Sequence, residues 1–513
     1  MAESTPNVGT IFAHHVAGNR PALVDLSQPD APRELTYREL DATCNAVARG
    51  LVRRGLGTGD RIGLLALNSA EYVATLFGAM KAGCVPVPLN AKLSADALAY
   101  VCRDAEIRLI FCDAAFARVC PAGLPRVEFD GNSEERFSSF VDPGPFTAVA
   151  VAPNEVCIQP YTSGSTGRPK GVLLSHAGQA WGIPAGTTAR HLKPDDRVLV
   201  AAPLCHKYGL LQLKYALCAG STVVLHRRFD PRLYIESIGR HAITSLTGVA
   251  TMYSMVLAEP ELLDTVDCTG VRSISVGSSP FAPLVFEGLA QRFPSAAPFN
   301  GYGITEAGGG VFGGHPNGPR RPLKSLGYPL PGVEVRLIGG PSPDEGVMLI
   351  RSKGVMLGYQ NLPEESARRL RDGWLDTGDV CRRDADGFYY FIRRADEMFK
   401  CGGENVYPRE VEEVLERHPD VVQAVVIAVD HEIKGQVPVA FVVPRRGTWP
   451  SEDLLKTWAL ENGPSYQHPR RVFVEQRLPV AGTGKVDKAK LRARALLAEI
   501  PVSLPRIRTG TPG

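Results

Sequence analysis

One short stretch of the chain combines glycines, hydroxyl side chains and a lysine. Its candidate anion-binding residues are Thr162, Ser163, Gly164, Ser165, Thr166, Gly167 and Lys170. Glycines leave the backbone free to curl, so that successive N–H groups can point at one anion. The hydroxyls add donors and the lysine adds positive charge, so the stretch predicts a polyphosphate-binding loop. It lacks the residue order of a Walker A loop, and a flexible polar linker is the alternative.

A second stretch, at residues 300–308, places a tyrosine between glycines and a threonine beside a glutamate. The small neighbours of Tyr302 leave its ring face open for a planar base. Thr305 offers a donor for phosphate, and Glu306 offers a carboxylate of the kind that binds Mg²⁺. A glycine-rich turn after a strand is the purely structural alternative.

Three further stretches lie nearer the C-terminus. The run at residues 374–379 ends in Asp379, whose carboxylate can accept hydrogen bonds from both hydroxyls of a ribose. A charged segment at residues 393–400 leads into two glycines, and Lys485 follows the Gly-Thr-Gly of residues 482–484. Taken singly, the three stretches are also compatible with an Asx-turn, a charged linker and a solvated lysine.

In this order, from residue 161 to residue 488, the stretches resemble the motifs of the adenylate-forming superfamily, and most closely its acyl-CoA synthetase branch. The superfamily also includes peptide-synthetase adenylation domains and firefly-type luciferases. The resemblance implies that ATP and AMP bind to Thr162, Ser163, Gly164, Ser165, Thr166, Gly167, Lys170, Gly277, Ser278, Ser279, Pro280, Asn300, Gly301, Tyr302, Gly303, Thr305, Asp379, Arg394 and Lys485.

The resemblance also implies chemical roles for individual residues. The catalytic residues that it indicates are Lys485, Thr305, Glu306 as the Mg²⁺ ligand, and His206 beside the reacting carboxylate. Asp396 would be the hinge of an interdomain rotation, and Gly402 and Gly403 would line a channel for the thiol arm of coenzyme A. The family usually has glycine where this chain has Arg393, a departure that affects backbone freedom beside the hinge.

The residues expected around the acyl group are His206, Lys207, Tyr208, Gly209, Gly303, Gly308, Gly309, Gly310 and Phe312. Lys207 is unusual in a segment that mostly carries apolar residues. We expect it to point to solvent by snorkelling. If it instead faces inward, it would favour an acid with a second carboxylate or a hydroxyl. The sequence does not name the acid.

The implied activity is that of an ATP-dependent acid:CoA ligase, with ATP, Mg²⁺ and coenzyme A as cofactors. The carboxylic acid would be activated as an acyl-adenylate with release of pyrophosphate and then transferred to the thiol. Two alternatives stay open: an adenylation enzyme that loads a carrier-protein thiol, and a catalytically silent nucleotide-binding relative. Residues 201–205 lack the aspartate that holds the amine in amino-acid-loading members, which disfavours an amino acid.

These motifs require a framework, and the apolar pattern predicts an α/β fold. Residues 35–55 and 70–82 have helical spacing, whereas residues 61–67, 108–112, 197–201, 221–225, 243–246 and 273–276 read as buried strands. Such alternation predicts two doubly wound parallel sheets. Short runs at residues 326–379 predict a distorted β-barrel. We expect an N-terminal domain at residues 1–394, a small mobile α/β domain at 395–500 and a disordered tail at 501–513.

Composition is that of an ordinary globular protein, with 44% hydrophobic and 22% charged residues. The net charge of +3 favours no nucleic-acid partner. Eleven scattered cysteines without a C-x-x-C pair indicate a reducing, cytoplasmic setting rather than a zinc site. The sequence shows no signal peptide and no transmembrane segment, and it leaves a homodimer open.

Overall fold

The computed structural model describes residues 5–131, 133–163, 168–277, 283–402, 404–481 and 485–497. Its first parallel sheet has the strand order β4-β3-β5-β6. The strands are β3 (Arg61–Leu65), β4 (Val85–Pro88), β5 (Ile107–Cys112) and β6 (Arg126–Glu128). The helices of this region are α1 (Tyr37–Arg53), α2 (Ala70–Lys81), α3 (Ala95–Asp104) and α4 (Phe137–Phe140). A capping box between Thr36 and Glu39 starts α1 at the expected place.

A second, seven-stranded sheet has the order β14-β13-β12-β10-β11-β1-β2, in which only β2 runs antiparallel. Its strands are β1 (Pro21–Leu26), β2 (Arg33–Thr36), β10 (Arg197–Val200), β11 (Thr222–His226), β12 (Ser245–Gly248), β13 (Ser273–Gly277) and β14 (Ala297–Gly301). Its helices are α5 (His176–Ala189), α6 (Lys207–Ala219), α7 (Pro231–Arg240), α8 (Ala250–Leu257), α9 (Pro260–Asp264) and α10 (Pro283–Arg292).

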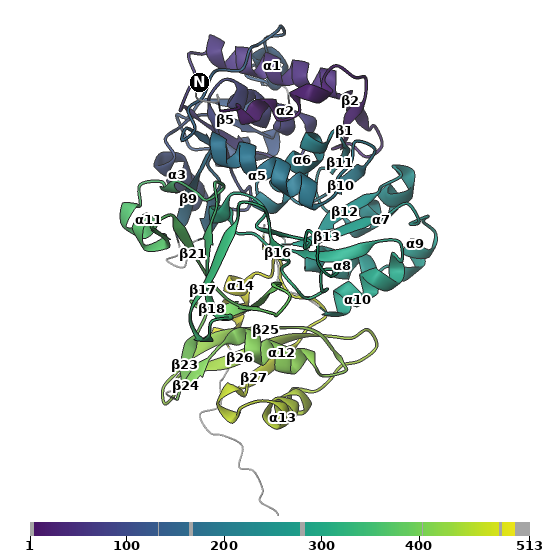
Figure 1. Cartoon of the computed structure of the whole chain (residues 1–513), viewed down its shortest axis with the longest axis vertical. Helices are drawn as coiled ribbons and strands as arrows, with labels where there is room; N and C mark the ends of the chain where they lie inside the picture. Colours follow the sequence, from purple (N-terminus) through teal and green to yellow (C-terminus); the bar gives the residue numbers. More distant parts are fainter. Residues whose placement is uncertain are drawn as a thin grey trace, which may run out of the picture.

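The two sheets share one core. Val198 and Val200 of β10 pack with β3 and with the helices α1, α2 and α6, whereas Leu199 packs on the other face of its sheet with α7, α8 and α10. This alternation places helices on both faces of the seven-stranded sheet, as expected for a doubly wound fold (Figure 1). The carboxyl ends of β10, β13 and β14 therefore open toward the segments that carry the predicted motifs.

Antiparallel sheets connect these layers to the C-terminal part. β7 (Val156–Ile158), β8 (Tyr161–Ser163) and β19 (Gly358–Tyr359) pair with β9 (Pro169–Ser175), and β15 (Phe312–Gly313) pairs with β16 (Tyr328–Pro329). β17 (Glu334–Ser342), β18 (Glu345–Arg351), β20 (Leu370–Arg371), β21 (Trp374–Arg383) and β22 (Tyr389–Arg394) form a third sheet next to α11 (Pro363–Arg369). The predicted phosphate loop connects the paired strands β8 and β9.

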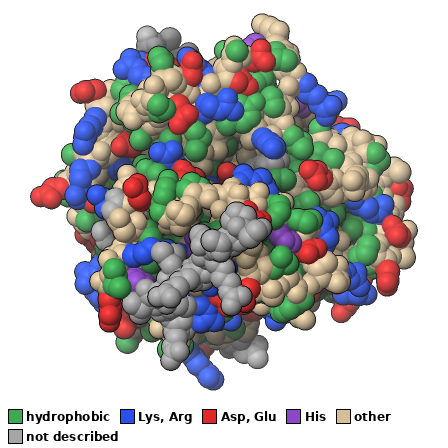
Figure 2. Space-filling view, turned by 90° about the horizontal axis from the view of Figure 1, so that it is seen from below, with side chains coloured by type: hydrophobic (Ala, Val, Ile, Leu, Met, Phe, Trp, Pro, Cys, Tyr) green, Lys and Arg blue, Asp and Glu red, His purple; other side chains and the backbone are tan. Residues whose placement is uncertain are grey.

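The C-terminal part has its own sheet and its own apolar core. Its strands are β23 (Phe399–Cys401), β24 (Glu404–Val406), β25 (Val421–His431), β26 (Gly435–Pro444) and β27 (Arg471–Val474), and its helices are α12 (Pro408–Glu416), α13 (Glu452–Asn462) and α14 (Lys488–Leu496). This part lies below the parallel sheets in Figure 1. On the face seen in Figure 2, basic and acidic side chains are interspersed rather than gathered into one patch.

The predicted fold class is confirmed: two parallel sheets, antiparallel β-structure and a small α/β part follow one another along the chain. Strands β1 and β2, which complete the seven-stranded sheet from the N-terminal side, and helix α14 were not predicted from the sequence. Within the described ranges, no helix is both long and apolar enough to cross a membrane.

Candidate active site

Tyr302, Asp379 and Arg394 meet in one hydrogen-bonded cluster. Tyr302 directly follows β14, Asp379 lies in β21, and Arg394 ends β22, which pairs with β21. The Tyr302 hydroxyl donates to one oxygen of Asp379 at 2.5 Å, and Arg394 Nη1 donates to the other at 2.7 Å. Asp379 is only 3% exposed. The sequence placed these residues in three separate motifs, and the structure brings them together.

Burial raises the pKa of Asp379, and the charge of Arg394 and the hydrogen bond from Tyr302 oppose that rise. Both carboxylate oxygens already accept hydrogen bonds from protein donors. Because each oxygen has two lone pairs, the group retains acceptor capacity for the two hydroxyls of a sugar. Asp379 is therefore a preorganised acceptor at the rim of the predicted base-binding surface.

Arg394 also holds Asp396. Its Nε donates to Asp396 Oδ1 at 2.9 Å and its Nη2 donates to Asp396 Oδ2 at 2.7 Å, which is a bidentate pair. Burial alone would raise the pKa of Asp396, but Arg394, with Arg369, lowers it. One guanidinium thus links the Asp379 cluster to the segment where the chain enters the C-terminal sheet.

The lysine of the predicted phosphate loop is held by an acidic partner. Lys170, in β9, donates from Nζ to Glu365 Oε2 of α11 at 2.7 Å, and its Nζ lies 5.5 Å from the centre of the Tyr359 ring. Lys170 lowers the pKa of Glu365. The residues Gly164, Ser165, Thr166 and Gly167, also predicted for this loop, lie outside the described residues, as do Ser278, Ser279, Pro280 and Gly403.

Replacing Glu365 with glutamine tests whether this pair restrains Lys170. A bound phosphate has to compete with the Glu365 carboxylate for the lysine, so Glu365→Gln is expected to tighten ATP binding by about two- to fivefold, the range for a partly exposed ion pair. The measurement is calorimetric titration with ATP. Glu364→Gln, an exposed neighbour on the same helix, is the matched control. Weaker ATP binding in Glu365→Gln would instead mean that Glu365 positions Lys170 for the nucleotide.

Thr305 and Glu306 lie in a short 3-10 turn after β14. Glu306 Oε1 accepts a hydrogen bond from the Tyr359 hydroxyl at 2.9 Å, which fixes one side of the carboxylate. The turn ends at Gly308, whose φ is +73°. A Cβ there would lie 1.8 Å from the carbonyl oxygen of Gly354, so only glycine fits. The packing therefore fixes the position of the Glu306 side chain.

The donor set fits Mg²⁺ that arrives with a nucleotide. Glu306 is a single half-buried carboxylate, and the described residues contain no cluster of three or more potential ligands that could hold a metal unaided. Mg²⁺ is usually bound by one or two carboxylates together with substrate phosphates and water. Glu306 meets that requirement.

Lys485 reaches this region from the C-terminal part. It lies just before α14 and interacts electrostatically with Asp379, Arg394 and Glu397. The surrounding protein lowers the pKa of Lys485, and the charge of Asp379 opposes that shift. The side chain is nevertheless open to solvent. A cation from the C-terminal part thus lies near the Asp379 cluster of the N-terminal part.

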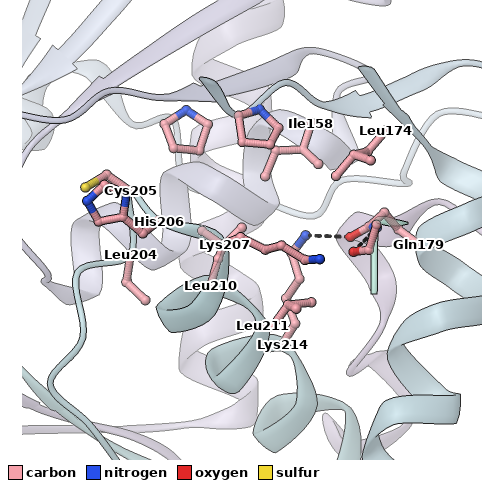
Figure 3. Close-up of a pocket in the computed structure, with 13 residues that line it drawn as sticks. Ile158, Leu174, Gln179, Leu204, Cys205, His206, Lys207, Leu210, Leu211 and Lys214 are labelled. Atoms are coloured by element: carbon pink, nitrogen blue, oxygen red, sulfur yellow. Dashed lines mark hydrogen bonds between the residues drawn. The ribbon is translucent and has the colours of Figure 1, made fainter. Parts of the chain in front are cut away.

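The predicted acyl segment forms the start of α6 and one wall of a pocket (Figure 3). His206, Lys207 and Gly308 line this pocket together with Gln179 and Lys214. Tyr208 lies elsewhere: its hydroxyl donates to Ser275 O at 2.9 Å, and its ring fills the space beside Gly277. Phe312 packs against Tyr302 and Tyr389. These two aromatic residues therefore border the predicted nucleotide-binding segments.

The expectation that Lys207 points to solvent is wrong. Its Nζ donates to the carbonyl oxygen of Ile304 and, at 3.4 Å, to that of Gly309. Burial lowers the pKa of Lys207 to about 7, and Glu306 opposes the shift. Lysine at the first turn of a helix surrounded by apolar residues normally extends to water. Here the carbonyl groups of residues 304–309 provide acceptors on the inner side.

Lys214 was missed by the sequence analysis. It lies seven residues after Lys207 on α6, is 1% exposed and donates to Gln179 Oε1 at 3.2 Å. Burial lowers its pKa to about 8. A lysine within the apolar run Leu213–Leu217 was the available signal, since lysine is almost never fully buried without a partner.

Two doubly wound sheets, a third antiparallel sheet with a buried carboxylate, and a lysine from a small C-terminal part define an adenylate-forming enzyme. The profile of the AMP-binding enzyme family matches residues 12–360, and that of the AMP-binding enzyme C-terminal domain matches residues 410–485. The chain belongs to the AMP-binding enzyme family, in the acyl-CoA synthetase branch of the adenylate-forming superfamily.

Individual relatives cover almost the whole chain. Feruloyl-CoA synthase from Amycolatopsis sp is 34% identical over 475 residues, which are 90% of this chain and 94% of the relative. Fatty acid--[acyl-carrier-protein] ligase ScoC from Streptomyces coeruleorubidus is 33% identical and covers 90% and 92%. The crystal structure of the anthranilate CoA ligase AuaEII with anthranoyl-AMP has a TM-score of 0.85 at 28% identity, covering 96% and 97%.

Proposed function

We propose that the protein is an ATP-dependent acid:CoA ligase that activates a carboxylic acid as its acyl-adenylate. The observation that carries this proposal is the proximity of Lys485, from the C-terminal part, to the Tyr302–Asp379–Arg394 cluster of the N-terminal part. A protein that only binds a nucleotide has no need for a second cation, in addition to Arg394, from a separate part of the chain. An enzyme that must stabilise charge on a transferring phosphoryl group does.

In the first half-reaction, a carboxylate oxygen of the acid attacks the α-phosphorus of ATP. The bond from that phosphorus to the bridging oxygen breaks, and pyrophosphate leaves with its electron pair. Tyr302 would stack on the base and Asp379 would hold the ribose, which fixes the α-phosphate for in-line attack. Thr305 and Lys485 would donate to its oxygens as negative charge builds. Mg²⁺ on Glu306 would supply further positive charge to the phosphates.

In the second half-reaction, the thiol of coenzyme A loses its proton, its sulfur attacks the acyl carbonyl carbon, and AMP leaves. Gly402 has φ +61°, and among the described residues nothing beyond its chain neighbours lies within 4 Å of the place where a Cβ would be, so a thin thiol arm could pass close to the backbone there. We place the domain boundary at residue 394 and the hinge at Asp396, because β22 ends at Arg394 and β23 of the next sheet begins at Phe399. His206 would lie beside the reacting carboxylate, since it precedes α6 at the pocket.

Relatives support CoA as the acceptor, because the feruloyl-CoA synthase is similar over nearly the whole chain. The carrier-protein ligase ScoC, of comparable similarity, favours a carrier-protein thiol as the second candidate. The eleven cysteines are all free thiols, which supports a reducing, cytoplasmic location.

Carboxylate-dependent exchange between ATP and labelled pyrophosphate tests the first half-reaction. Aliphatic, hydroxy, dicarboxylic and aromatic acids are assayed as separate pools. The pools should differ in the exchange that they support, and at least one of them should support it. Adding CoA or a phosphopantetheinylated carrier protein to the active pool then identifies the acceptor by thioester formation. ATP binding without exchange in any pool would contradict the proposed activity and leave a silent nucleotide-binding protein.

A further inference from the structure

A cleft of about 660 Å³ lies at the amino ends of strands in the seven-stranded sheet. Its walls include Ser273, the first residue of β13, and Ala297, the first residue of β14. These two strands run parallel, so their carboxyl ends, where Tyr302 follows β14, lie at the opposite edge of the sheet. The volume is within the range of ordinary ligand sites, roughly 300–1,000 Å³. The cleft is therefore a candidate for a ligand site separate from the predicted nucleotide site.

The walls of this cleft carry an excess of positive charge. The basic side chains that line it include Arg190, Lys193, Arg272, Arg320 and Arg321. Asp196 is the single carboxylate among the described residues of the lining. It is already paired, because Arg272 Nη2 lies 2.6 Å from its Oδ1 and the backbone N–H of Lys193 donates to its Oδ2 at 2.8 Å. Asp196 therefore does not balance the other cations.

Four of the basic residues have no carboxylate within ion-pair distance in the described part of the chain: Arg190, Lys193, Arg320 and Arg321. Arg190 makes one side-chain hydrogen bond to the described residues, from Nη1 to Ser275 Oγ at 2.9 Å. Because a guanidinium group has five N–H donors, Arg190 retains donors for a ligand. Lys193 and Arg320 are exposed.

Arg190 and Arg321 share an aromatic neighbour. Their guanidinium carbons lie 5.2 Å and 5.6 Å from the centre of the Phe299 ring. Arg321 donates to three backbone carbonyl oxygens, and its Nε has no hydrogen-bond partner among the described residues. Burial and the charge of Arg190 lower the pKa of Arg321 to about 10. The two cations thus repel each other, and a bound anion would relieve that repulsion.

The chemistry of the walls favours an organic phosphate. A guanidinium group can bind two phosphate oxygens with parallel hydrogen bonds. A phosphate ester carries more negative charge than a single carboxylate, which suits a site with several cations. The lining also includes the apolar side chains Leu192, Phe299 and Leu323. An inorganic ion would leave this apolar surface uncovered, whereas the body of an organic phosphate would bury it.

We propose that the cleft binds a small organic phosphate of about nucleotide size, whose phosphate group accepts hydrogen bonds from Arg190. Arg321, Lys193 and Arg320 supply further positive charge. AMP and the nucleotide end of coenzyme A share this chemistry, and the experiment below separates them. The inference does not rest on the proposed ligase activity, because the cleft lies at the other edge of the sheet and the test measures binding alone.

Protection of Lys193 from an amine-reactive reagent locates the ligand. Acetylation of individual lysines by acetic anhydride is followed by peptide mass spectrometry, without ligand and with AMP, adenosine 3′,5′-bisphosphate or pyrophosphate. At least one of the two nucleotides should slow the acetylation of Lys193 saturably, and the nucleotide that protects at the lower concentration identifies the source. Adenosine, which has no phosphate, should not protect. Lys490, exposed on α14, is the internal control and should react at an unchanged rate.

The other outcomes of this experiment count against the proposal. Protection by pyrophosphate that equals or exceeds that of both nucleotides would show a site for an inorganic anion and overturn the assignment to an organic phosphate. Protection by adenosine would show that the phosphate is not what binds. Unchanged acetylation of Lys193 with all three phosphate probes would overturn the site itself.

Arg190→Gln and Arg320→Gln assign the binding to residues of the cleft, with the Kd read from the concentration dependence of Lys193 protection. Arg190→Gln should raise the Kd about tenfold, the lower end of the range for a hydrogen bond to a charged group. Arg320→Gln should raise it about two- to threefold, as for an exposed cation. The matched control is Arg382→Gln, which removes an exposed arginine of β21 that lies 5.1 Å from the Tyr390 ring centre, and it should leave the Kd unchanged.

The melting temperature separates lost binding from lost folding. This check is needed for Arg190→Gln, because Arg190 also lies over the rings of Tyr215 and Phe299. If that variant does not fold, the exposed Arg320 decides the question. An unchanged Kd in folded Arg190→Gln, or in Arg320→Gln if Arg190→Gln does not fold, would refute the inference.

Discussion

Replacing Lys485 with alanine is expected to slow acyl-adenylate formation by about a hundredfold to a thousandfold, the range for removing a group that stabilises a developing anion. Lys485 is the cation that the C-terminal part brings close to Asp379. Without it, the charge that accumulates on the α-phosphoryl oxygens loses its mobile donor. Thioester formation from supplied acyl-AMP should keep most of its rate, because the phosphoryl chemistry is then complete.

Single-turnover assays of the two half-reactions measure this separation. Lys490→Ala removes an exposed lysine nearby, in α14, and should change neither step. Because the surrounding protein lowers the pKa of Lys485 below the ordinary 10.5, the first half-reaction should lose rate on the alkaline side at a lower pH than an ordinary lysine dictates. Equal loss of rate in both half-reactions of Lys485→Ala would contradict the assignment of Lys485 to acyl-adenylate formation.

The second large effect is expected at Asp379. Asp379→Asn keeps the shape of the side chain but removes the charge that pairs with Arg394 at 2.7 Å. An asparagine amide offers one acceptor oxygen instead of two, so it cannot serve Tyr302, Arg394 and two ribose hydroxyls together. The KM for ATP should rise about tenfold to a hundredfold.

The matched control breaks another Arg–Asp pair of the same strand. Asp344→Asn removes the partner of Arg383 in β21, an exposed pair with Nη2 and Oδ1 2.6 Å apart, and should leave ATP binding unchanged. ATP affinity is measured by titration, and the melting temperature separates lost binding from lost folding. If Asp379→Asn binds ATP normally, the carboxylate serves the β21–β22 packing and not the nucleotide.

The local motifs could be predicted because the residues that define the chemistry of each motif lie close together in the sequence. Tyr302, Thr305 and Glu306 lie within five positions, and their side-chain types indicate base, phosphate and metal contacts without any knowledge of the fold. The alternating strands and helices could likewise be predicted, because the periodicity of their apolar residues is visible within a short stretch of sequence. What the sequence does not contain is the pairing between distant segments. β1 joins β11 across nearly two hundred residues, so the N-terminal strands were missed.

The same limit applies inside the site. The direction of Lys207 depends on carbonyl groups 97 residues away at Ile304, and the partner of Lys170 is 195 residues away at Glu365. No local rule selects these partners. As far as its neighbours in the sequence are concerned, a long side chain can reach water or the interior at a similar cost in free energy. General propensity favoured water for Lys207, and the tertiary environment of α6 reversed that preference.

Arg394 holds two carboxylates at once, Asp379 at the proposed ribose site and Asp396 at the entry to the C-terminal sheet. Any ligand that changes the charge around Asp379 therefore changes how firmly Arg394 holds Asp396. Thermodynamic linkage requires the reverse as well: an orientation of the C-terminal part that releases Asp396 must alter nucleotide affinity by the same factor. The orientation of the C-terminal part would thus report whether the nucleotide site is occupied.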